Sequence, residues 1–559
     1  MAEMRRGIKR DNMLYEKKKN NATFKLIVAF FFLVAFELWT FRNIIFSGML
    51  LGNNEDGMLA ILMTEHWYKV LCGFEKWNNW ISMYPVRNTV ALNDMYILHA
   101  IFYCPLRFFG VDKYMAYQAA VILIHACGSV CMMLFLNKAL KFDAYYSLLG
   151  TACFSYGSYY VIKLVHSQLV SLAVVPLIMT AAYLFVYYVI YSDKKRRILW
   201  MFIGIMGEVL LFYSSPYVAE FVLITLSIYL VALIIISDKK SLFGGVLNYI
   251  KHSWYEPLLG VACGILLMIP FCLVYFPWRG ENVRSYKYAS AFFISFRDLF
   301  NVSNGNLLYG RLISELPFTF GENTVGLTPV MWLLAICSIV VAFRNKDKVI
   351  CALAITFIVL IFVPMRIKGH CLWILFYSFF PGASGMRVVC RLFLMILPLL
   401  AVLVSYSCVK ISEKLGENKG SDSISSLFVI IAICIVFENS LTSGVPSAWN
   451  HESAIVSEAE FDVAPPEDCE SFYLVDSAGT PEQAEFPAYY QGFLNAWRIA
   501  DKYDVPSING FGSFTPKKYK KIYNIYAENY MEEVAAWIET NNLQGVYSYD
   551  LATKEWKRN

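Results

Sequence analysis

The stretch FKLIVAFFFLVAFELWTFRNIIFSGMLLGNNEDGML, residues Phe24 to Leu59, decides how the rest of the chain is interpreted. Its first part, Phe24 to Trp39, is almost entirely apolar and approaches the roughly 20 residues that a helix needs to cross a bilayer. Its last part, LGNNEDGML, brings two acids, Glu55 and Asp56, and a flexible glycine soon after that segment. The stretch therefore predicts a membrane span followed by either a solvated turn or a chemical site at the membrane surface.

The composition of the whole chain also indicates a membrane protein. Of the 559 residues, 58% are hydrophobic and 16% are charged. A soluble protein is nearer to about half apolar and about a quarter charged. Several further stretches approach the length of a span, so we expect an all-α polytopic membrane domain with about eleven spans.

The positions of the basic residues orient these spans. Residues 1–22 form a basic segment that the positive-inside rule keeps in the cytoplasm. The apolar segment Tyr96–Phe109 is short and contains Pro105 and Arg107, so we interpret it as a juxtamembrane helix on the outer face. With that choice, the basic loops at 137–141, 192–197, 237–240, 344–348 and 410–414 all become cytoplasmic. The membrane domain then covers residues 23–438, and its first outer loop covers residues 40–113.

Residues 439–559 differ sharply in composition from the part before them, and the topology puts them outside the cell. SFYLVDS (471–477) and GVYSYDL (545–551) alternate as strands do, whereas 489–503 and 526–541 have helical periodicity. INGFGSF (508–514) contains the glycine and asparagine residues that are typical of a tight loop. We expect a small, soluble, extracytoplasmic α/β domain.

The first outer loop has the features of a membrane-level surface. MLAILMTEHWYKVL (58–71) is amphipathic and is predicted to lie in the interface, and the tryptophans and tyrosines after it suit the level of the lipid headgroups. Acids in a loop are usually solvated, but a loop that only joined two spans would not need this surface. The context therefore favours a functional role for Glu55 and Asp56.

Further polar candidates lie in other predicted outer segments. The turn KLVHSQ contains His166 and Gln168, which are read either as structural residues or as groups that orient an acceptor or an acid. Near the glycine-rich turn PGASG, a basic cluster either snorkels to headgroups or holds a phosphate by bidentate hydrogen bonds. This cluster is formed by Arg366, Lys368, His370, Arg387 and Arg391, with Arg279, Arg284 and Lys287 as weaker candidates. No Walker, GxGxxG, HExxH or Ser–His–Asp pattern is present, so the sequence gives no signal for nucleotide hydrolysis or metalloprotease activity.

In the order of these parts the chain resembles the GT-C class of integral-membrane glycosyltransferases, and particularly the bacterial YfhO-like branch. A first span is followed by the acidic motif NNEDG, and then by Pro85, Asn88 and Leu92–Asp94. The later parts of the resemblance are SYGSYYVIKLVHSQLVSLAVVPL (155–177), ENTVGLTPVMWLLAI (322–336), PGASGMRVVCRLFLMILPLLAVL (381–403) and DKYDVPSINGFGSFTPKKY (501–519). The motifs cover most of the chain, and none is diagnostic alone.

The resemblance implies a GT-C-like fold and a transferase that takes a sugar from a polyprenyl-phosphate donor on the outer leaflet. It implies that Asp56 is the general base, with Glu55 as helper or substitute, and that His166, Gln168 and Asp94 bind substrate. Arg387 and Arg391, with Lys368 and His370, become the phosphate-binding residues. The expected partners are membrane lipid, the lipid-linked sugar as co-substrate, and a glycan or glycolipid acceptor, with no nucleic acid. Because transferases that use polyprenyl-phosphate sugars often need no metal, the resemblance also implies a site without a metal ion.

Two other functions fit the same pattern. A transporter or flippase of lipid-linked saccharides would share the aromatic surface and the basic residues, but it would not need an acid at Asp56. A non-catalytic membrane scaffold would use residues 439–559 to bind a wall polymer or a partner. A large outer cavity with Asp56 and His166 on its wall favours the transferase, and a lateral cavity open to the cytoplasm favours the flippase.

Overall fold

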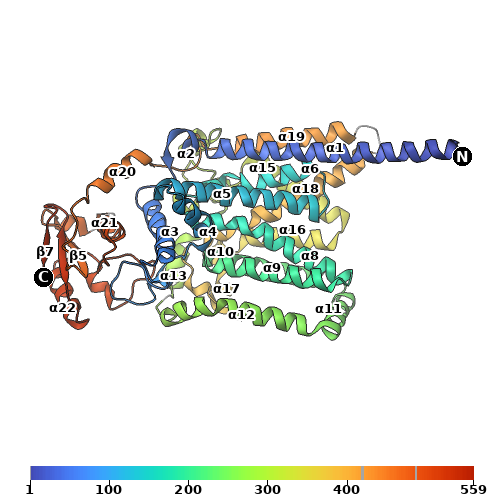
Figure 1. Ribbon diagram of the computed structural model, residues 1–559. Coiled ribbons are helices and arrows are strands. Elements are labelled where there is room, and N and C mark those ends of the chain that lie inside the picture. The colour runs from blue at the N-terminus through green and yellow to red at the C-terminus, as the bar shows by residue number, and fades with distance from the viewer. Residues whose placement is uncertain (1, 282, 417–420, 485–487) are drawn as a thin grey trace.

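The computed structural model describes residues 2–281, 283–416, 421–484 and 488–559. Long helices run side by side through most of the protein (Figure 1). The bundle helices are α1 (Ala2–Thr40), α5 (Lys113–Leu134), α6 (Ala144–Ser155), α8 (Val175–Ile190), α9 (Lys194–Phe212), α10 (Pro216–Ile236), α12 (Tyr255–Tyr275), α15 (Pro329–Asn345), α16 (Lys348–Phe362), α18 (Ile396–Gly416) and α19 (Ser421–Glu438). Shorter connecting helices are α2 (Arg42–Ser47), α4 (Ile97–Phe108), α7 (Ser158–Lys163), α11 (Lys239–Ser253), α13 (Tyr286–Ala289), α14 (Gly310–Glu315) and α17 (Trp373–Phe379).

Six helical segments in the described part of the chain are long and apolar enough to cross a membrane. They are Asn21–Thr40, Lys113–Ala139, Ser167–Ile190, Pro216–Ile236, Tyr255–Trp278 and Val389–Leu415. Four shorter apolar helices, Ile97–Phe108, Pro329–Asn345, Lys348–Phe362 and Ser426–Glu438, accompany them. This is the helix content of a multi-pass membrane protein, whereas the total of about eleven spans stays a prediction.

The helix that contains Val389–Leu415 is central in the bundle. In its most apolar window 94% of the residues are buried inside the protein, against 11% for Tyr255–Trp278 at the periphery. By contrast, α4 has 12 residues and a length of about 18 Å, which is too short to cross the roughly 30 Å core of a bilayer. Its place as a juxtamembrane helix on the outer face stays a prediction.

One end of the bundle is covered by other parts of the chain. Figure 1 shows α3 (Asp56–Cys72) running across this end, with the residues that follow α19 beyond it, while the amino terminus of α1 lies at the opposite end. We call this the capped end. Residues 439–559 and the first loop therefore lie on the same side of the bundle, as the predicted topology requires.

The C-terminal region forms a small sheet with helices around it. Strand β5 (Ser471–Val475) pairs in parallel with β6 (Val546–Asp550), and β6 pairs in antiparallel with β7 (Trp556–Arg558). Helices α20 (His451–Ala459), α21 (Ala488–Tyr503) and α22 (Tyr530–Thr540) accompany the sheet. The sequence periodicity at 471–477 and 545–551 corresponds to β5 and β6.

This C-terminal region is joined closely to the first loop. Strand β1 (Met49–Leu50) pairs with β4 (Trp449–Asn450), and the backbone of Met83 donates to the carbonyl of Asn509 at 3.3 Å. Met83 and Leu92 of the first loop also belong to the hydrophobic core of the C-terminal sheet. The C-terminal sheet therefore has a hydrophobic core to which the first loop adds side chains, and Tyr490, Phe493, Leu494 and Trp497 of the same region belong to the core of the helical bundle.

Helix α3 differs from the expectation of an interfacial helix. It covers the predicted segment, but its residues from Gly57 to His66 and Lys69 are buried. The buried Glu65 carboxylate accepts from Arg107 of α4 at 2.7 Å, and the Lys69 amine contacts Asp504, just after α21, at 2.6 Å. The helix is covered by protein on both sides, and its amphipathic pattern reflects these protein contacts instead of a lipid surface.

Candidate functional site

The carboxylate of Asp56 is presented at the capped end by the first turn of α3. The Asn53 side chain accepts from the backbone N–H groups of Glu55 at 3.2 Å and Asp56 at 2.8 Å, which satisfies donors that a helix start leaves free. A Cβ atom at Gly57 would lie 2.8 Å from the carbonyl of Leu51, so only glycine fits there. The local sequence NNEDG thus fixes the turn, and the Asp56 side chain stays 47% exposed.

His166 faces Asp56 from the turn between α7 and the helical turn Ser167–Val174. Its Nδ1 lies 3.7 Å from Asp56 Oδ2, and its Nε2 lies 3.1 Å from Glu322 Oε1. Burial and the nearby Arg391 lower the pKa of His166, against the opposing effects of Glu322 and Asp56. We assign the neutral tautomer that donates from Nε2 to Glu322, which leaves Nδ1 as an acceptor.

Glu322 connects His166 to two cationic side chains. Its carboxylate accepts from Lys163 Nζ at 3.1 Å and from Arg391 Nε at 3.2 Å, and Arg391 Nη2 donates to its other oxygen. Burial alone would raise the pKa of Glu322, but Arg391 and Lys163 lower it well below its ordinary value. The anion is therefore stable at neutral pH and holds both cations next to His166.

Asp94 and Gln168 form a second polar group beside this one. The Tyr96 hydroxyl donates to Gln168 Oε1 at 3.1 Å. Burial raises the pKa of Asp94 to about 7, although Arg391 and a hydrogen bond from Gln168 oppose the change. Asp94 therefore titrates near neutral pH, close enough to Arg391 for the two charges to interact.

The C-terminal region contributes a side chain to the site. Tyr490 on α21 is 6% exposed, and its hydroxyl donates to Asp56 Oδ1 at 3.1 Å across 434 positions of sequence. Together, the carboxylate of Asp56 and Nδ1 of His166 present two acceptors to one position, next to the cations that Glu322 holds. This arrangement is suited to remove a proton from a hydroxyl group beside a bound anion.

Of the residues proposed from the sequence, Asp56, His166, Gln168, Asp94 and Arg391 come together here, and Glu55 is adjacent. Burial, and then Asp56, raise the pKa of Glu55. Arg387 lies apart from Glu322: its backbone N–H donates to the Tyr217 hydroxyl at 2.7 Å, and Nη1 contacts the Tyr288 hydroxyl at 3.4 Å.

Lys368 and His370 occupy an exposed hairpin formed by β2 (Arg366–Ile367) and β3 (His370–Cys371). Among the described residues, no hydrogen bond or ion pair joins either side chain to the Glu322 group. Their assignment to phosphate binding stays a prediction.

Glu322, Lys163 and Tyr490 were not predicted as site residues. Glu322 is the first residue of ENTVGLTPVMWLLAI and Lys163 the first of KLVHSQ, so both stand in stretches that the sequence already singled out. The contact between Lys163 and Glu322 joins residues 159 positions apart, so no local sequence pattern predicts it. No group of three or more His, Cys, Asp or Glu residues within the described ranges is arranged to hold a metal ion. The expectation of a metal-free site stays a prediction.

This chain is similar to solved structures, but it matches neither a family profile nor a curated protein. Among solved structures it is similar to the cryo-EM structure of the arabinofuranosyltransferase AftD from Mycobacteria, with 12% sequence identity and a TM-score of 0.46. The match covers 89% of this chain and 32% of that one, so this chain spans about a third of the length of that transferase.

Proposed function

We propose that this protein is a membrane glycosyltransferase that moves a sugar from a polyprenyl-phosphate donor to an acceptor hydroxyl at the outer face of the membrane. The support is the geometry around Asp56. A half-exposed carboxylate lies 3.7 Å from His166 Nδ1, and the same imidazole contacts the Glu322 carboxylate that pairs with Lys163 and Arg391. A base and an anion-binding group are thus adjacent.

In the proposed step, Asp56 accepts the proton of the acceptor hydroxyl as its oxygen attacks the anomeric carbon. The bond from that carbon to the phosphate oxygen breaks, and the polyprenyl phosphate leaves with the electron pair. His166 Nδ1 accepts a hydrogen bond from the same hydroxyl or from its neighbour on the acceptor. Arg391 and Lys163 balance the charge of the departing phosphate.

Glu322 has a defined part in this proposal. Without donor it neutralises Arg391 and Lys163, which would otherwise be uncompensated cations in a largely buried site. The donor phosphate competes for the same guanidinium hydrogen bonds, because a phosphate and a carboxylate both match the planar fork of arginine. Glu322 then remains with His166 and keeps the imidazole in the tautomer that exposes Nδ1.

The test uses the full-length protein in lipid nanodiscs, supplied with radiolabelled polyprenyl-phosphate sugars and candidate glycan or glycolipid acceptors. We expect transfer by the unaltered protein and a loss of about 10²- to 10⁴-fold in Asp56→Asn, since general base catalysis contributes that much. Glu55→Gln is the matched control, because it removes a neighbouring acid and should keep most of the activity.

Two results would contradict the proposal. Full transfer by Asp56→Asn would remove Asp56 from the chemistry. Movement of the labelled lipid between leaflets without any transfer, by both the unaltered protein and Asp56→Asn, would instead support the flippase.

A further inference from the structure

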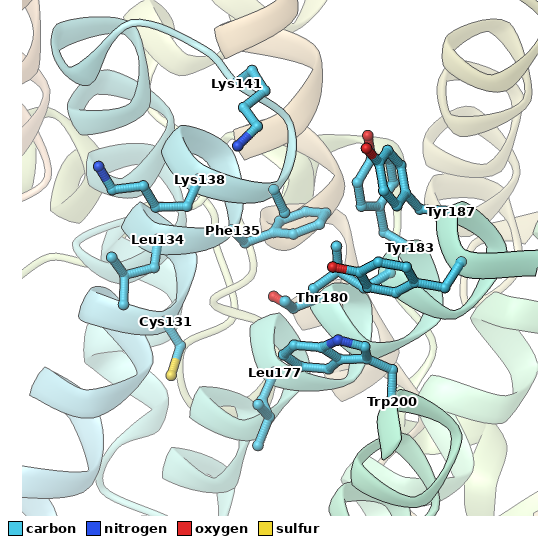
Figure 2. Close-up of a pocket in the computed structure, with 13 residues that line it drawn as sticks. Cys131, Leu134, Phe135, Lys138, Lys141, Leu177, Thr180, Tyr183, Tyr187 and Trp200 are labelled. Carbon is cyan, nitrogen blue, oxygen red and sulfur yellow. The ribbon is translucent and has the colours of Figure 1, made fainter. Parts of the chain in front are cut away.

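A groove of about 480 Å³ lies between α5, α8 and α9, far from Asp56 (Figure 2). Helix α5 begins at the capped end, where Lys113 contacts Asp501 of α21 at 2.9 Å. Leu134, at the other end of this 22-residue helix, lines the groove, which is about 30 Å further along the bundle. The groove therefore belongs to the amino-terminal end and is separate from the proposed catalytic site.

The walls of the groove are apolar and aromatic. Figure 2 shows Trp200 and Leu177 on one side, with the rings of Tyr183 and Tyr187 near them and Leu134 across the groove. The side chains of Leu134, Tyr183 and Tyr187 are exposed although they are large and apolar. A surface of this kind at the side of a membrane bundle is suited to contact a hydrocarbon chain.

Two lysines stand on the rim of this apolar surface. The π-helical turn Phe135–Ala139 carries Lys138, and Lys141 has φ of 63° in the turn that follows, so the backbone bends around the end of the groove. In Figure 2 Lys141 lies above Phe135, and Lys138 lies on the side of the groove where Leu134 is found. Both lysine side chains are exposed.

Neither lysine is neutralised within the protein. In the part of the chain that the structure describes, no hydrogen bond or ion pair involves the amine of Lys138 or Lys141. The nearest acid in sequence, Asp143, instead accepts from Lys25 Nζ at 3.2 Å and from the backbone N–H of Tyr145 at 2.9 Å. The rim therefore carries two free positive charges beside an apolar groove.

We propose that this groove binds an anionic membrane phospholipid, with its phosphate at Lys138 and Lys141 and an acyl chain along Leu177 and Trp200. The positive charge of the two lysines favours an anionic lipid over a zwitterionic one. A zwitterionic headgroup carries an ammonium group that the lysines repel, whereas an anionic headgroup has no such group. In the topology proposed above, this end of the bundle faces the cytoplasmic leaflet, where lysines attract anionic lipid headgroups.

Tryptophan fluorescence tests the proposal, because Trp200 lines the groove. The full-length protein is placed in phosphatidylcholine nanodiscs with increasing fractions of phosphatidylglycerol, and bromine is put on the acyl chains of one lipid at a time. The difference in fluorescence between the unaltered protein and Trp200→Phe gives the contribution of Trp200. We expect brominated phosphatidylglycerol to quench this contribution at a fraction about tenfold lower than brominated phosphatidylcholine, as two lysines near a headgroup would produce.

In the double variant Lys138→Gln/Lys141→Gln, the two brominated lipids should quench Trp200 to the same extent. The matched control is Lys346→Gln/Lys348→Gln, which removes one exposed lysine between α15 and α16 and another at the first residue of α16, and it should keep the preference. Equal quenching by the two lipids in the unaltered protein would overturn the proposal, as would a preference that survives the first double variant or is lost in the control. A second result would also overturn the proposal. If stoichiometric polyprenyl phosphate relieves the quenching but further unbrominated phosphatidylglycerol does not, the groove binds a donor-type lipid instead.

Discussion

His166 donates from Nε2 to Glu322 Oε1 across 3.1 Å, and this contact determines which imidazole nitrogen faces Asp56. A carboxylate that holds the donating nitrogen leaves the other nitrogen free to accept a hydrogen bond, as in serine-protease triads. The same carboxylate carries the hydrogen bonds of Arg391 and Lys163. One anion therefore sets both the tautomer of the imidazole and the position of the cations.

Replacing Glu322 with Gln tests this double role. We expect transfer to fall by about 10²-fold, the lower range for a group that supports acid–base catalysis. The acid limb of the pH profile should also move to lower pH. Glu322 raises the pKa of His166 against burial, so its loss lowers that pKa further, and an imidazole with a lower pKa stays unprotonated to lower pH.

The measurement is the rate of sugar transfer between pH 5 and 9. Glu315→Gln is the control, since Glu315 is an exposed acid on α14 that pairs with Arg311 at 3.7 Å. An unshifted acid limb in Glu322→Gln would mean that His166 does not influence the ionisation that limits the rate.

Tyr490→Phe measures what the C-terminal region contributes to the site. The Tyr490 hydroxyl donates to Asp56 Oδ1 at 3.1 Å, and hydrogen bonds to charged groups are worth about 1.5–3 kcal/mol. We expect kcat to fall by about tenfold or somewhat more, because Asp56 loses a hydrogen bond that fixes its carboxylate. Tyr503→Phe on the same helix should leave kcat unchanged, since the Tyr503 hydroxyl donates to the Phe461 carbonyl instead. Equal effects of the two variants would indicate a general disturbance of α21.

The carboxyl of Asp94 should make donor binding depend on pH. Its pKa is raised to about 7 by burial, so it is neutral at pH 6 and mostly ionised at pH 8. The ionised form places a negative charge beside Arg391 and weakens the binding of an anionic phosphate. We expect the Kd for the polyprenyl-phosphate donor to increase between pH 6 and pH 8, and this increase to disappear in Asp94→Asn. Binding that weakens equally with pH in both proteins would exclude Asp94 as the titrating group.

Asp501→Asn should separate the C-terminal region from the bundle. Asp501 lies between Lys113 Nζ at 2.9 Å and Lys69 Nζ at 3.2 Å, and these two cations lower its pKa although burial opposes them. Removing one member of a buried ionic group costs about 3–5 kcal/mol, because the remaining charges stay desolvated. We expect a lower unfolding temperature and faster limited proteolysis between α19 and α21.

Asp462→Asn is the control for this variant. Asp462 pairs with Lys502, also on α21, but its side chain is 68% exposed. An exposed pair contributes about 0–1 kcal/mol, so proteolysis and unfolding should hardly change. Similar behaviour of the two variants would mean that the buried charges do not attach the region to the bundle.

Some of this site could be predicted from the sequence. Asp56 was identified because a first span ends shortly before it, and His166 because a short polar turn interrupts two apolar helices. Both signals are local: they depend on the period of apolar residues and on the residues that interrupt it. Arg391 was predicted to hold a phosphate, but the sequence carried no sign of its pairing with Glu322.

The sequence by itself determined the helical membrane character, the strands at β5 and β6, and the turn that starts α3. Each follows from neighbouring residues, because backbone preference and hydrophobic period act over a few positions. Only the tertiary structure decided that α3 is covered by protein, that Glu322 joins His166 to Arg391, and that Tyr490 meets Asp56 across 434 positions. Such contacts depend on how whole helices pack, and packing free energy is shared among many residues that no local pattern identifies.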